Sequence, residues 1–423
     1  MSPENDDHDR NRESSDERPN STLAERYPGL EVLRASPENA QTDSRENLAK
    51  YLTPREQHYI RNHYRTPEID RAEWTVSLTG MVDESIDLSM DEPEHDFSTE
   101  SVIHTMECSG NGRAYFEPDA DGDQWTFGAI GTTVWTGTPL RDVLAAYGAA
   151  TDEGPWLSVM GGETIDDEDV FCRSIPMSKI VDDCLLASEM NGSPMRSEHG
   201  YPVRLVVPGW FGNNSVKWVD RIHVTNEMVS GEEWRSKDGR DYTEYQQSSY
   251  RIVPAGEDAS ERYADVGEFS TYDQLRATNG IENAYFFDQL VKSIVVTPGE
   301  DATVSRSSEG VVSVTGIAWS GDDPVARVEV STDGGETWSD AEFVGPDLGP
   351  YAVRKFRYAW RPDPGTHTFC SRATDERGRT QPATISDPDE GLRGIENGKY
   401  PWNRKGYGNN AYEPLGVTVT GEE

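Results

Sequence analysis

Apolar and polar positions change their spacing several times along the chain, and this spacing predicts its elements. The segment EWTVSLTG alternates apolar and polar residues, which is typical of a half-buried strand. Between residues 101 and 227, short apolar runs rich in β-branched and aromatic residues are separated by glycine-rich turns, which indicates further strands. PLRDVLAAYG has apolar residues at helical spacing and predicts a short helix, and another helix is expected to begin at Thr53-Pro54. These patterns predict a mixed α+β domain over residues 46–288.

After Lys292 the pattern becomes a series of short strands, such as GVVSVTGIAW, PVARVEVSTDGGETW and GTHTFCSRATDERG. Turn signals recur between them at Asp333-Gly334-Gly335, Pro364-Gly365 and Arg377-Gly378, a spacing typical of an antiparallel sandwich. We therefore predict an all-β, immunoglobulin-like second domain over residues 289–423. Residues 230–285 form a polar connection without strong periodicity, and residues 1–45 are expected to be a flexible acidic tail.

The net charge of the chain disfavours some classes of binding partner. It contains 77 Asp and Glu against 39 Lys and Arg, and its formal net charge is −38. A surface this acidic repels nucleic acid and anionic lipid, so neither is an expected partner. Self-repulsion at this charge also disfavours compaction in dilute buffer, whereas at about 1 M salt the Debye length is only ~3 Å. We interpret the composition as adaptation to high salt, with an acidic mesophilic protein as the alternative.

The same survey gives an expected location. No apolar run approaches the roughly 20 residues needed to span a bilayer, and MSPENDDHDRNRESSDERPN has none of the features of an export signal. The four cysteines, at positions 108, 172, 184 and 370, show no CxxC spacing and are too few for a disulfide scaffold. We expect a cytoplasmic protein with reduced thiols that does not associate with membranes.

Cys108 is the first candidate for chemistry. In HTMECSGNGR it lies between an apolar strand and a Gly110-Asn111-Gly112 turn, with Arg113 following. Backbone N–H groups of such a turn and a neighbouring arginine favour a thiolate, so we expect a lowered pKa and a role as metal ligand or nucleophile. The alternative is a small buried hydrophobic residue, which is what most isolated cysteines are.

Two further clusters carry positive charge. HGYPVRLVVPGWFGNNSVKW brings His199, Arg204 and Lys217 close together in a very acidic chain, around a glycine- and asparagine-rich loop whose backbone N–H groups suit an anion. Phosphate is the natural ligand of such a set, although a basic rim paired with neighbouring carboxylates is an equal alternative. YIRNHYRTP contributes Arg61, Asn62 and His63, which by themselves are typical of a polar surface loop.

Taken together and in this order, these clusters resemble the molybdenum domain of the sulfite oxidase family. YIRNH is similar to the family's aromatic-x-Arg-Asn-His element, and ECSGNGR is similar to its Cys-Ala-Gly-Asn-x-Arg signature. WTFGAI, FCRSIP, LLASEMNG, HGYPVRLVVPG and SVKW continue the series. VEVSTDGGETW, AWRPDPG and PWNRKGYGNN resemble the family's immunoglobulin-like dimerisation domain. The resemblance extends from about Asn47 to the C-terminus.

The resemblance implies a molybdenum–molybdopterin cofactor, with Cys108 as the molybdenum ligand. It implies that Arg61, Arg113 and Trp125 line the pocket of a small anionic substrate, to which the C-terminal segment contributes Lys405. The residues that it implies for holding the pterin and its phosphate are Asn62, His63, Glu163, His199, Arg204, Ser215, Val216 and Lys217. The chemistry implied is oxygen-atom transfer, followed by electron transfer to an acceptor. A homodimer formed through the second domain is also implied.

Departures from the family pattern keep other hypotheses open. Ser188 replaces the tyrosine of the family's Leu-Leu-Ala-Tyr-Glu-Met-Asn-Gly segment, and Lys405 replaces an arginine and loses its bidentate geometry. No haem or flavin module is recognisable, so a separate electron acceptor is expected. The leading hypothesis is oxidation of sulfite or a related small oxyanion. A molybdopterin reductase of nitrate, an S-oxide or an N-oxide is the second, and a cofactor-free binding protein with calcium-binding loops such as Ser331–Gly335 is the third.

Overall fold

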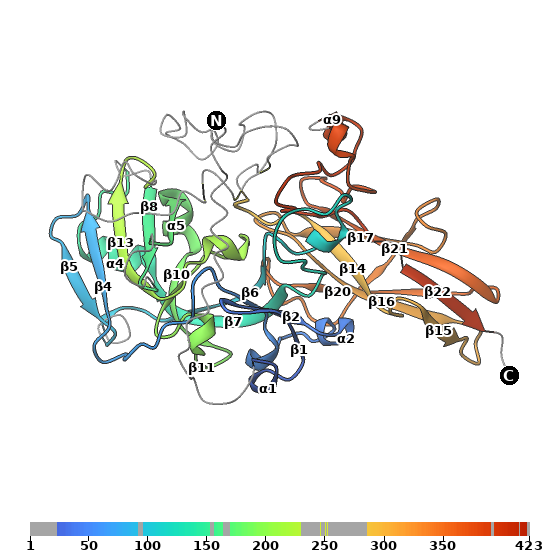
Figure 1. Cartoon of the computed structure of the whole chain (residues 1–423), viewed down its shortest axis with the longest axis horizontal. Helices are drawn as coiled ribbons and strands as arrows, with labels where there is room; N and C mark the ends of the chain where they lie inside the picture. Colours follow the sequence, from blue (N-terminus) through green and yellow to red (C-terminus); the bar gives the residue numbers. More distant parts are fainter. Residues whose placement is uncertain are drawn as a thin grey trace, which may run out of the picture.

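The computed structural model describes residues 23–91, 96–152, 156–163, 170–229, 246, 250, 252, 286–390, 393–413 and 415–420. These residues form two parts that lie side by side, an N-terminal part up to residue 229 and a β-rich part from residue 286 onward (Figure 1). Among the described residues no helix is long and apolar enough to cross a membrane.

The N-terminal part begins with a small sheet that the sequence did not predict. The short helix α1 (Leu23–Arg26) leads into the antiparallel strands β1 (Leu30–Ala35) and β2 (Glu38–Thr42), and β2 also pairs with β3 (Ile60–Arg61). The prediction of a flexible tail up to residue 45 is therefore wrong from residue 23 onward, and residues 1–22 lie outside the described residues. The polar strand β2 is buried throughout because neighbouring side chains and strands satisfy its polar groups.

The helix predicted at Thr53-Pro54 is also wrong. Only the single 3₁₀ turn η1 (Arg55–Gln57) forms there, after the one-turn helix α2 (Arg45–Leu48). The chain then extends as His58 and Tyr59 become buried, and it continues into β3. Tertiary burial of these two aromatic side chains outweighs the weak local helical signal.

Two five-stranded sheets make up most of the N-terminal part. In one, the strands follow the order β11-β10-β7-β6, and β12 also pairs with β10. Its strands are β6 (Glu100–Glu107), β7 (Ile130–Pro139), β10 (Leu185–Met190), β11 (Ser193–Pro194) and β12 (Arg204–Val206). The other has the order β5-β4-β13-β8-β9, with β4 (Thr75–Gly80), β5 (Ile86–Ser89), β8 (Trp156–Gly161), β9 (Cys172–Pro176) and β13 (Val219–Thr225).

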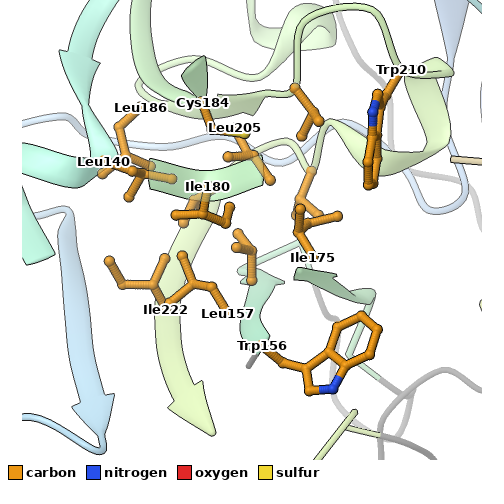
Figure 2. Packing of buried hydrophobic residues seen from close by; sticks show 14 of the residues in the cluster. Leu140, Trp156, Leu157, Ile175, Ile180, Cys184, Leu186, Leu205, Trp210 and Ile222 are labelled. Atoms are coloured by element: carbon orange, nitrogen blue, oxygen red, sulfur yellow. The ribbon is translucent and has the colours of Figure 1, made fainter. Parts of the chain in front are cut away.

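The two sheets and two helices share one hydrophobic core (Figure 2). Helix α4 (Leu140–Ala146) forms where the apolar spacing predicts it, and α5 (Met177–Asp183) packs beside it. Leu157 and Ile222 from the second sheet contact Ile180 of α5 in this core. Burying each such side chain contributes about 2 kcal/mol, so the core holds the strands that end at the candidate site. Cys184 belongs to the same core and is a small buried hydrophobic residue.

The second part is a sandwich of two sheets, which confirms the predicted all-β architecture. One sheet has the order β14-β16-β20-β19 and the other β15-β22-β21-β17-β18. The strands of the first are β14 (Lys292–Thr297), β16 (Val312–Trp319), β19 (Glu342–Val344) and β20 (Arg354–Trp360). Those of the second are β15 (Ala302–Ser305), β17 (Val325–Ser331), β18 (Ser339–Asp340), β21 (Gly365–Asp375) and β22 (Leu415–Thr420). Val314, Val328, Phe356 and Phe369 fill the space between the sheets.

The segment between β21 and β22 returns to the N-terminal part. It contains η8 (Pro388–Glu390) and α9 (Arg393–Glu396), and its buried aromatic residues Tyr400 and Trp402 cluster with Phe116. A second mixed cluster joins Phe127 and Ile130 of the N-terminal part to Trp319 of β16. The two parts therefore share buried surface close to the loop that carries Cys108. The predicted fold class, an α+β domain followed by an all-β sandwich, is confirmed.

Candidate active site

A cavity lies among the ends of β3, β6, β8 and β12. Cys108, Arg61 and Lys217, which belong to three separate sequence clusters, all line it. The complete lining is His58, Tyr59, Arg61, His63, Met106, Cys108, Ser109, Glu163, Phe171, Glu198, His199, Arg204, Gly212, Asn213, Ser215, Lys217, Trp218 and Tyr250. Segments up to 190 residues apart in the sequence thus meet at one cavity, which local patterns alone do not predict.

Cys108 follows directly after β6 and begins a tight loop. Its N–H donates to the carbonyl of Ala129 at 2.9 Å, and its own carbonyl accepts from Asn111 N–H at 2.9 Å. Gly112 has a φ of +89°, a conformation that favours glycine, and a Cβ at Gly110 would lie only 2.8 Å from Nη2 of Arg113. The glycines therefore allow the loop to turn close to the arginine.

The expected lowering of the Cys108 pKa is wrong for the chain without its cofactor. Burial raises the pKa of the thiol, although Arg61 and Arg113 act in the opposite direction. The cysteine is 7% exposed and shares a cluster with Met106 and Trp125, so desolvation of the thiolate outweighs the attraction of the two guanidinium groups. A bound cation would supply the missing stabilisation of the thiolate.

Arg204 and Lys217 are basic residues that line the cavity. The Arg204 guanidinium donates to the carbonyl oxygens of His199 at 2.9 Å and Ser215 at 2.8 Å, and its Cζ lies 4.9 Å from the centre of the Trp135 ring. Burial lowers the pKa of Arg204 to about 10, so it remains charged at neutral pH. It is held by carbonyl groups and not by the carboxylates of a paired basic rim.

Lys217 has three oxygen acceptors around its ammonium group. Nζ donates to the carbonyls of Glu198 at 2.9 Å and Arg61 at 3.1 Å, and to the side-chain oxygen of Asn62. Burial and the charge of Arg204 lower the pKa of Lys217 to about 7. An anion bound beside it would raise this pKa, so binding of an anion and uptake of a proton are coupled at this position.

Two histidines of the cavity are neutral, which corrects the expectation that His199 is a cation. Burial, followed by the neighbouring His58, lowers the pKa of His199 well below its usual value, and burial lowers that of His58 to about 4. Their rings pack edge to face with centroids 5.3 Å apart. Nδ1 of His199 and Nε2 of His58 have no hydrogen-bond partner among the described residues. Neutral imidazoles of this kind can donate to or accept from a ligand.

Glu163 presents an uncommon group, a buried neutral carboxyl. Burial raises the pKa of Glu163 to about 8, and Oε2 has no hydrogen-bond partner among the described residues. Gly161 makes room for this side chain, because a Cβ at that position would overlap Oε2. At neutral pH the carboxyl is a hydrogen-bond donor to any ligand in the cavity.

Of the other residues predicted to hold the cofactor, Ser215 and His63 line the cavity, and Asn62 and Val216 do not. Asn62 is fully buried and does not line the cavity: its Nδ2 donates to Glu38 at 3.0 Å, and its Oδ1 accepts from Lys217. Ser215 lines the cavity, and its Oγ accepts from the N–H of Val207 at 3.1 Å. Val216 is buried in the core and its carbonyl accepts from Leu205 N–H. His63 lines the cavity beside Phe171.

Three residues expected to line a substrate pocket do not line this cavity. The Arg113 guanidinium donates to the backbone carbonyls of Lys405 at 2.6 Å and Asp123 at 2.8 Å, and it stacks on the ring of Tyr407. Trp125 is 1% exposed and packs in a hydrophobic cluster with Cys108. Only the carbonyl of Lys405 is involved in this arrangement. Carbonyl groups and aromatic rings hold Arg113 and Trp125 beside the cysteine loop, and the role of these three residues in a substrate pocket stays a prediction.

Most of the remaining lining residues were missed by the sequence analysis. His58 directly precedes the YIRNH element and Tyr59 begins it, and the alternation of a strand places Tyr59 on the same face as Arg61. Ser109 adjoins Cys108, and Glu198 and Trp218 adjoin His199 and Lys217, so proximity to predicted residues was the available signal. Phe171 begins the FCRSIP segment of the resemblance, whereas Tyr250 lies in a segment without periodicity and gave no signal. Arg173, fully buried, stacks on both of these rings at 4.4 and 4.6 Å.

The cavity passes a direct test for a polar, metal-carrying ligand. Five of its lining residues have a buried side-chain nitrogen or oxygen atom without a partner in the part of the chain that the structure describes, namely His58, Ser109, Glu163, His199 and Asn213. Buried polar atoms of this kind are costly unless a ligand satisfies them. The described residues contain no group of three or more His, Cys, Asp or Glu that could hold a metal. A metal bound by Cys108 as part of a cofactor would bring further ligands with it.

Comparison with known proteins defines the class. Residues 63–234 match the family described as the oxidoreductase molybdopterin binding domain, and residues 284–404 match the Mo-co oxidoreductase dimerisation domain. The soft thiolate of Cys108 and the unsatisfied polar atoms fit such a cofactor. The chain thus combines a region that matches a molybdopterin-binding domain with a region that matches a Mo-co dimerisation domain.

Individual relatives narrow this class. The chain is 31% identical to human mitochondrial sulfite oxidase over 388 residues, which cover 88% of this chain and 64% of that protein. It is 29% identical to chicken sulfite oxidase, over 88% of this chain and 76% of that protein. It is 30% identical to barley nitrate reductase [NAD(P)H], over 87% of this chain and 39% of that protein. The sulfane dehydrogenase SoxCD of Paracoccus pantotrophus superposes with a TM-score of 0.67 at 26% identity, covering 91% of this chain and 85% of that chain.

The chain carries an oxidoreductase molybdopterin-binding domain and a Mo-co dimerisation domain, and it is homologous to the sulfite oxidases. It spans 64% of the length of the human, mouse and rat sulfite oxidases that it matches. The calcium-binding interpretation of the second domain fits less well, because the carboxylate of Asp333 accepts hydrogen bonds from Ser331 and Thr337 within its own turn.

Proposed function

We propose that the chain is an oxygen-atom-transfer oxidoreductase that oxidises sulfite or a related small oxyanion at a molybdenum–molybdopterin centre ligated by Cys108. The observation that carries this proposal is the position of Cys108. It is the one cysteine among the residues that line the described cavity, and it shares this cavity with the basic residues Arg61, Arg204 and Lys217. The other three cysteines are buried elsewhere, as Cys184 is in the hydrophobic core.

The chain's own residues divide the task of holding the cofactor. We assign Arg204 and Lys217, with the Gly212–Ser215 backbone, to a phosphate group, because charged donors and backbone N–H groups bind phosphate well. Glu163, His199 and His63 would bind the polar edge of the pterin, where the buried carboxyl and imidazole atoms can each form a hydrogen bond. Asn62 orients Lys217 from behind. When bound, the cofactor supplies the oxygen-atom transfer and stores the two electrons released.

Electrostatics favour an anionic substrate only inside the cavity. A chain of net charge −38 repels anions over most of its surface. Arg61 provides a local cation at the cavity, and its pKa stays above its usual value because the acidic groups of Tyr250, Cys108 and Tyr407 offset the effect of burial. A guanidinium can bind two oxygens of an oxyanion at once. Arg61 would therefore orient the substrate.

Aromatic residues line the cavity beside its charged groups and lower the local polarity. Tyr59, Phe171, Trp218 and Tyr250 line it together with Arg61, Arg204 and Lys217. In such a site, interactions between charges are several times stronger than in bulk water. Arg113, held by two carbonyls behind the cysteine loop, adds positive potential to the thiolate without contacting the substrate in this arrangement.

Reduction of nitrate, an S-oxide or an N-oxide is the second candidate function. The similarity to barley nitrate reductase favours it, as does Ser188 in place of the family's tyrosine. Ser188 lies at an irregularity in the pairing of β10 with β7, between Ala187 and Glu189, and does not line the cavity. Substrate contact through this position is therefore weaker than a tyrosine would allow.

We further propose that the chain forms a homodimer through its second domain and passes electrons to a separate acceptor. The match of residues 284–404 to the Mo-co oxidoreductase dimerisation domain supports the first of these proposals. Light scattering coupled to size-exclusion chromatography in high salt would measure the mass, and a mass near that of a 47.2 kDa monomer would contradict it. For the second, reduction of the protein by substrate followed by reoxidation with ferricyanide would show that no built-in acceptor is needed.

The reaction itself can be tested in both directions. The holoenzyme is assayed with sulfite and ferricyanide, and separately with a reduced viologen dye and nitrate or a sulfoxide. We expect sulfite-dependent turnover, which Cys108→Ser abolishes. Cys184→Ser is the matched control, because Cys184 is equally buried but lies in the hydrophobic core away from the cavity. Turnover only with the reduced dye would establish the second function, and full activity in Cys108→Ser would contradict both.

A further inference from the structure

The residue directly before Cys108 is a buried carboxylate bound from the second domain. Glu107 is 1% exposed, and its Oε1 accepts from the ammonium group of Lys292 at 2.6 Å. Its Oε2 accepts from the indole N–H of Trp319 at 2.8 Å. Lys292 and Trp319 are a cross-strand pair of β14 and β16, so both donors belong to one rigid edge of the sandwich. The carboxylate is thus clamped from two directions.

The surroundings of Lys292 keep its ammonium group at the Glu107 carboxylate. It is 2% exposed, and its Nζ lies 5.6 Å from the centre of the Phe127 ring and 5.8 Å from that of Trp319. Two aromatic rings and the carboxylate therefore surround the ammonium group. A charge buried in this way is costly without its partner, so the geometry of Lys292 and Glu107 is strongly defined.

The same carboxylate also fixes the cysteine loop from inside. Oε1 of Glu107 accepts from the side-chain amide of Asn111 at 3.0 Å, and Oδ1 of Asn111 accepts from the N–H of Ala129 at 3.0 Å. Asn111 N–H in turn donates to the carbonyl of Cys108. A shift of Glu107 would be transmitted to the backbone on both sides of the cysteine through these hydrogen bonds.

The second part of the molecule holds the loop at two more points. Gly408 N–H donates to the carbonyl of Ser109 at 2.7 Å, and the side-chain amide of Asn409 donates to the carbonyl of Gly112 at 2.9 Å. Gly408 has a φ of +72°, and a Cβ there would overlap Phe286 and Tyr400, so a glycine is needed for this close approach. The cysteine loop is therefore bound to the second part of the chain before the cysteine, at Glu107, and after it, at Ser109 and Gly112.

We propose that Glu107 and Lys292 are positioning residues through which the second domain sets the orientation of the Cys108 thiolate. This inference rests on the proposed function in that it takes Cys108 as the metal ligand. It makes the dimerisation domain a functional part of the metal site. Groups that orient a metal ligand affect metal binding about 10–100-fold when removed. The competing explanation is an ordinary buried ion pair that only joins the two parts.

The chain contains a control for that explanation. Lys179 of α5 is also a buried lysine, and its Nζ contacts Asp322 of the second part at 2.8 Å and Asp183 at 2.9 Å. None of these residues lines the cavity or bonds to the cysteine loop. Lys179→Met therefore removes an ion pair between the same two parts of the chain, but leaves the surroundings of Cys108 unchanged.

The test compares Lys292→Met, Trp319→Phe and Lys179→Met in the full-length protein. Trp319→Phe removes the indole donor to Glu107 together with some buried ring volume and keeps Lys292, so it remains informative where Lys292→Met does not fold. The first readout is amide hydrogen exchange of the peptide that contains Cys108 to Gly112, measured by mass spectrometry on cofactor-free protein. The second is the molybdenum content per chain and the thiolate-to-metal charge-transfer absorption of protein produced with cofactor.

We expect exchange of the loop amides to accelerate by about tenfold or more in Lys292→Met, and molybdenum content to fall about tenfold with a shifted absorption band. Trp319→Phe should change both in the same direction by less, and Lys179→Met should change neither. Equal loop exchange in Lys292→Met and Lys179→Met, with equal molybdenum content, would overturn the inference. A wild-type chain that binds no molybdenum would instead overturn the proposed function, and the exchange comparison would still decide whether the pair positions the loop.

Discussion

Replacing Glu163 by glutamine should stabilise the cofactor-free protein, and increasingly so as the pH rises. Glu163 is 5% exposed, and burial raises its pKa from 4.5 to about 8. Below pH 4.5 the carboxyl is protonated in both the folded and unfolded chain. Between pH 4.5 and 8 the unfolded chain releases this proton while the folded chain retains it, so the free energy of unfolding decreases with pH. Above about pH 8 the contribution becomes constant.

The size of the effect follows from these two values. Each pH unit inside this window corresponds to about 1.4 kcal/mol, so the complete penalty at the upper end is roughly 4–5 kcal/mol. Glutamine has nearly the same shape and never ionises, so Glu163→Gln avoids the penalty. The difference in unfolding free energy between Glu163→Gln and wild type should therefore widen by roughly 3 kcal/mol between about pH 5.5 and about pH 7.5.

The assay is urea denaturation of the cofactor-free proteins at several pH values, followed by circular dichroism at constant high salt. Because both proteins share every other titrating group, the difference between their curves isolates position 163. Equal m values would show that the unfolded states are comparable. Glu100→Gln, at an exposed position outside the cavity, is the surface control. A Glu163→Gln difference that does not change with pH would mean that Glu163 is ionised beside Lys217, and the reasoning about burial would be refuted.

Three further predictions address the core, the histidines and the charge. Leu157→Ala should destabilise the N-terminal domain by roughly 3 kcal/mol in urea denaturation, since Leu157 is fully buried between sheet and helix, and a loss below about 1 kcal/mol would contradict that packing. Nuclear magnetic resonance of His58 should show a neutral ring down to pH 5, because burial lowers the pKa of His58 to about 4. The stability linked to this ring is present above pH 6.5 and is lost as the pH falls toward 4. Titration of the ring near pH 6.5 would argue against its burial. Raising the salt from about 0.1 M to about 1 M should increase the melting temperature, because screening reduces self-repulsion, and a decrease would contradict the high-salt interpretation.

Much of the architecture follows from local patterns that the sequence shows directly. The spacing of PLRDVLAAYG determines α4 because one face of a short helix can be buried in the core. The turn signals of the second domain, such as Gly334 and Gly335 with positive φ, determine where its strands end. The N-terminal sheet was missed because β2 is polar. Its burial depends on partners such as Asn62 and Glu31 that lie elsewhere in the sequence.

The candidate site, like the fold, could be predicted only in part from local sequence patterns. Cys108, Arg61, Arg204 and Lys217 stand out by residue type, and the fold brings them to one cavity. Their electrostatic state depends on burial, which no spacing reveals: the thiol pKa is raised, and His199 is neutral. The orientation of the Arg113 side chain could not be predicted, because it is set by the carbonyls of Asp123 and Lys405, and Lys405 lies almost 300 residues away in the sequence. Contacts between distant segments are the part that local sequence reasoning cannot supply.

The central claim is that the sulfur of Cys108 binds molybdenum, and X-ray absorption at the molybdenum edge measures this most directly. The protein should be purified with its cofactor in high salt and compared with Cys108→Ser and with the buried control Cys184→Ser. The account predicts that the metal of Cys108→Ser, where any is retained, has one sulfur neighbour fewer than that of the wild type, while Cys184→Ser is unchanged. An identical sulfur shell in wild type and Cys108→Ser would contradict it.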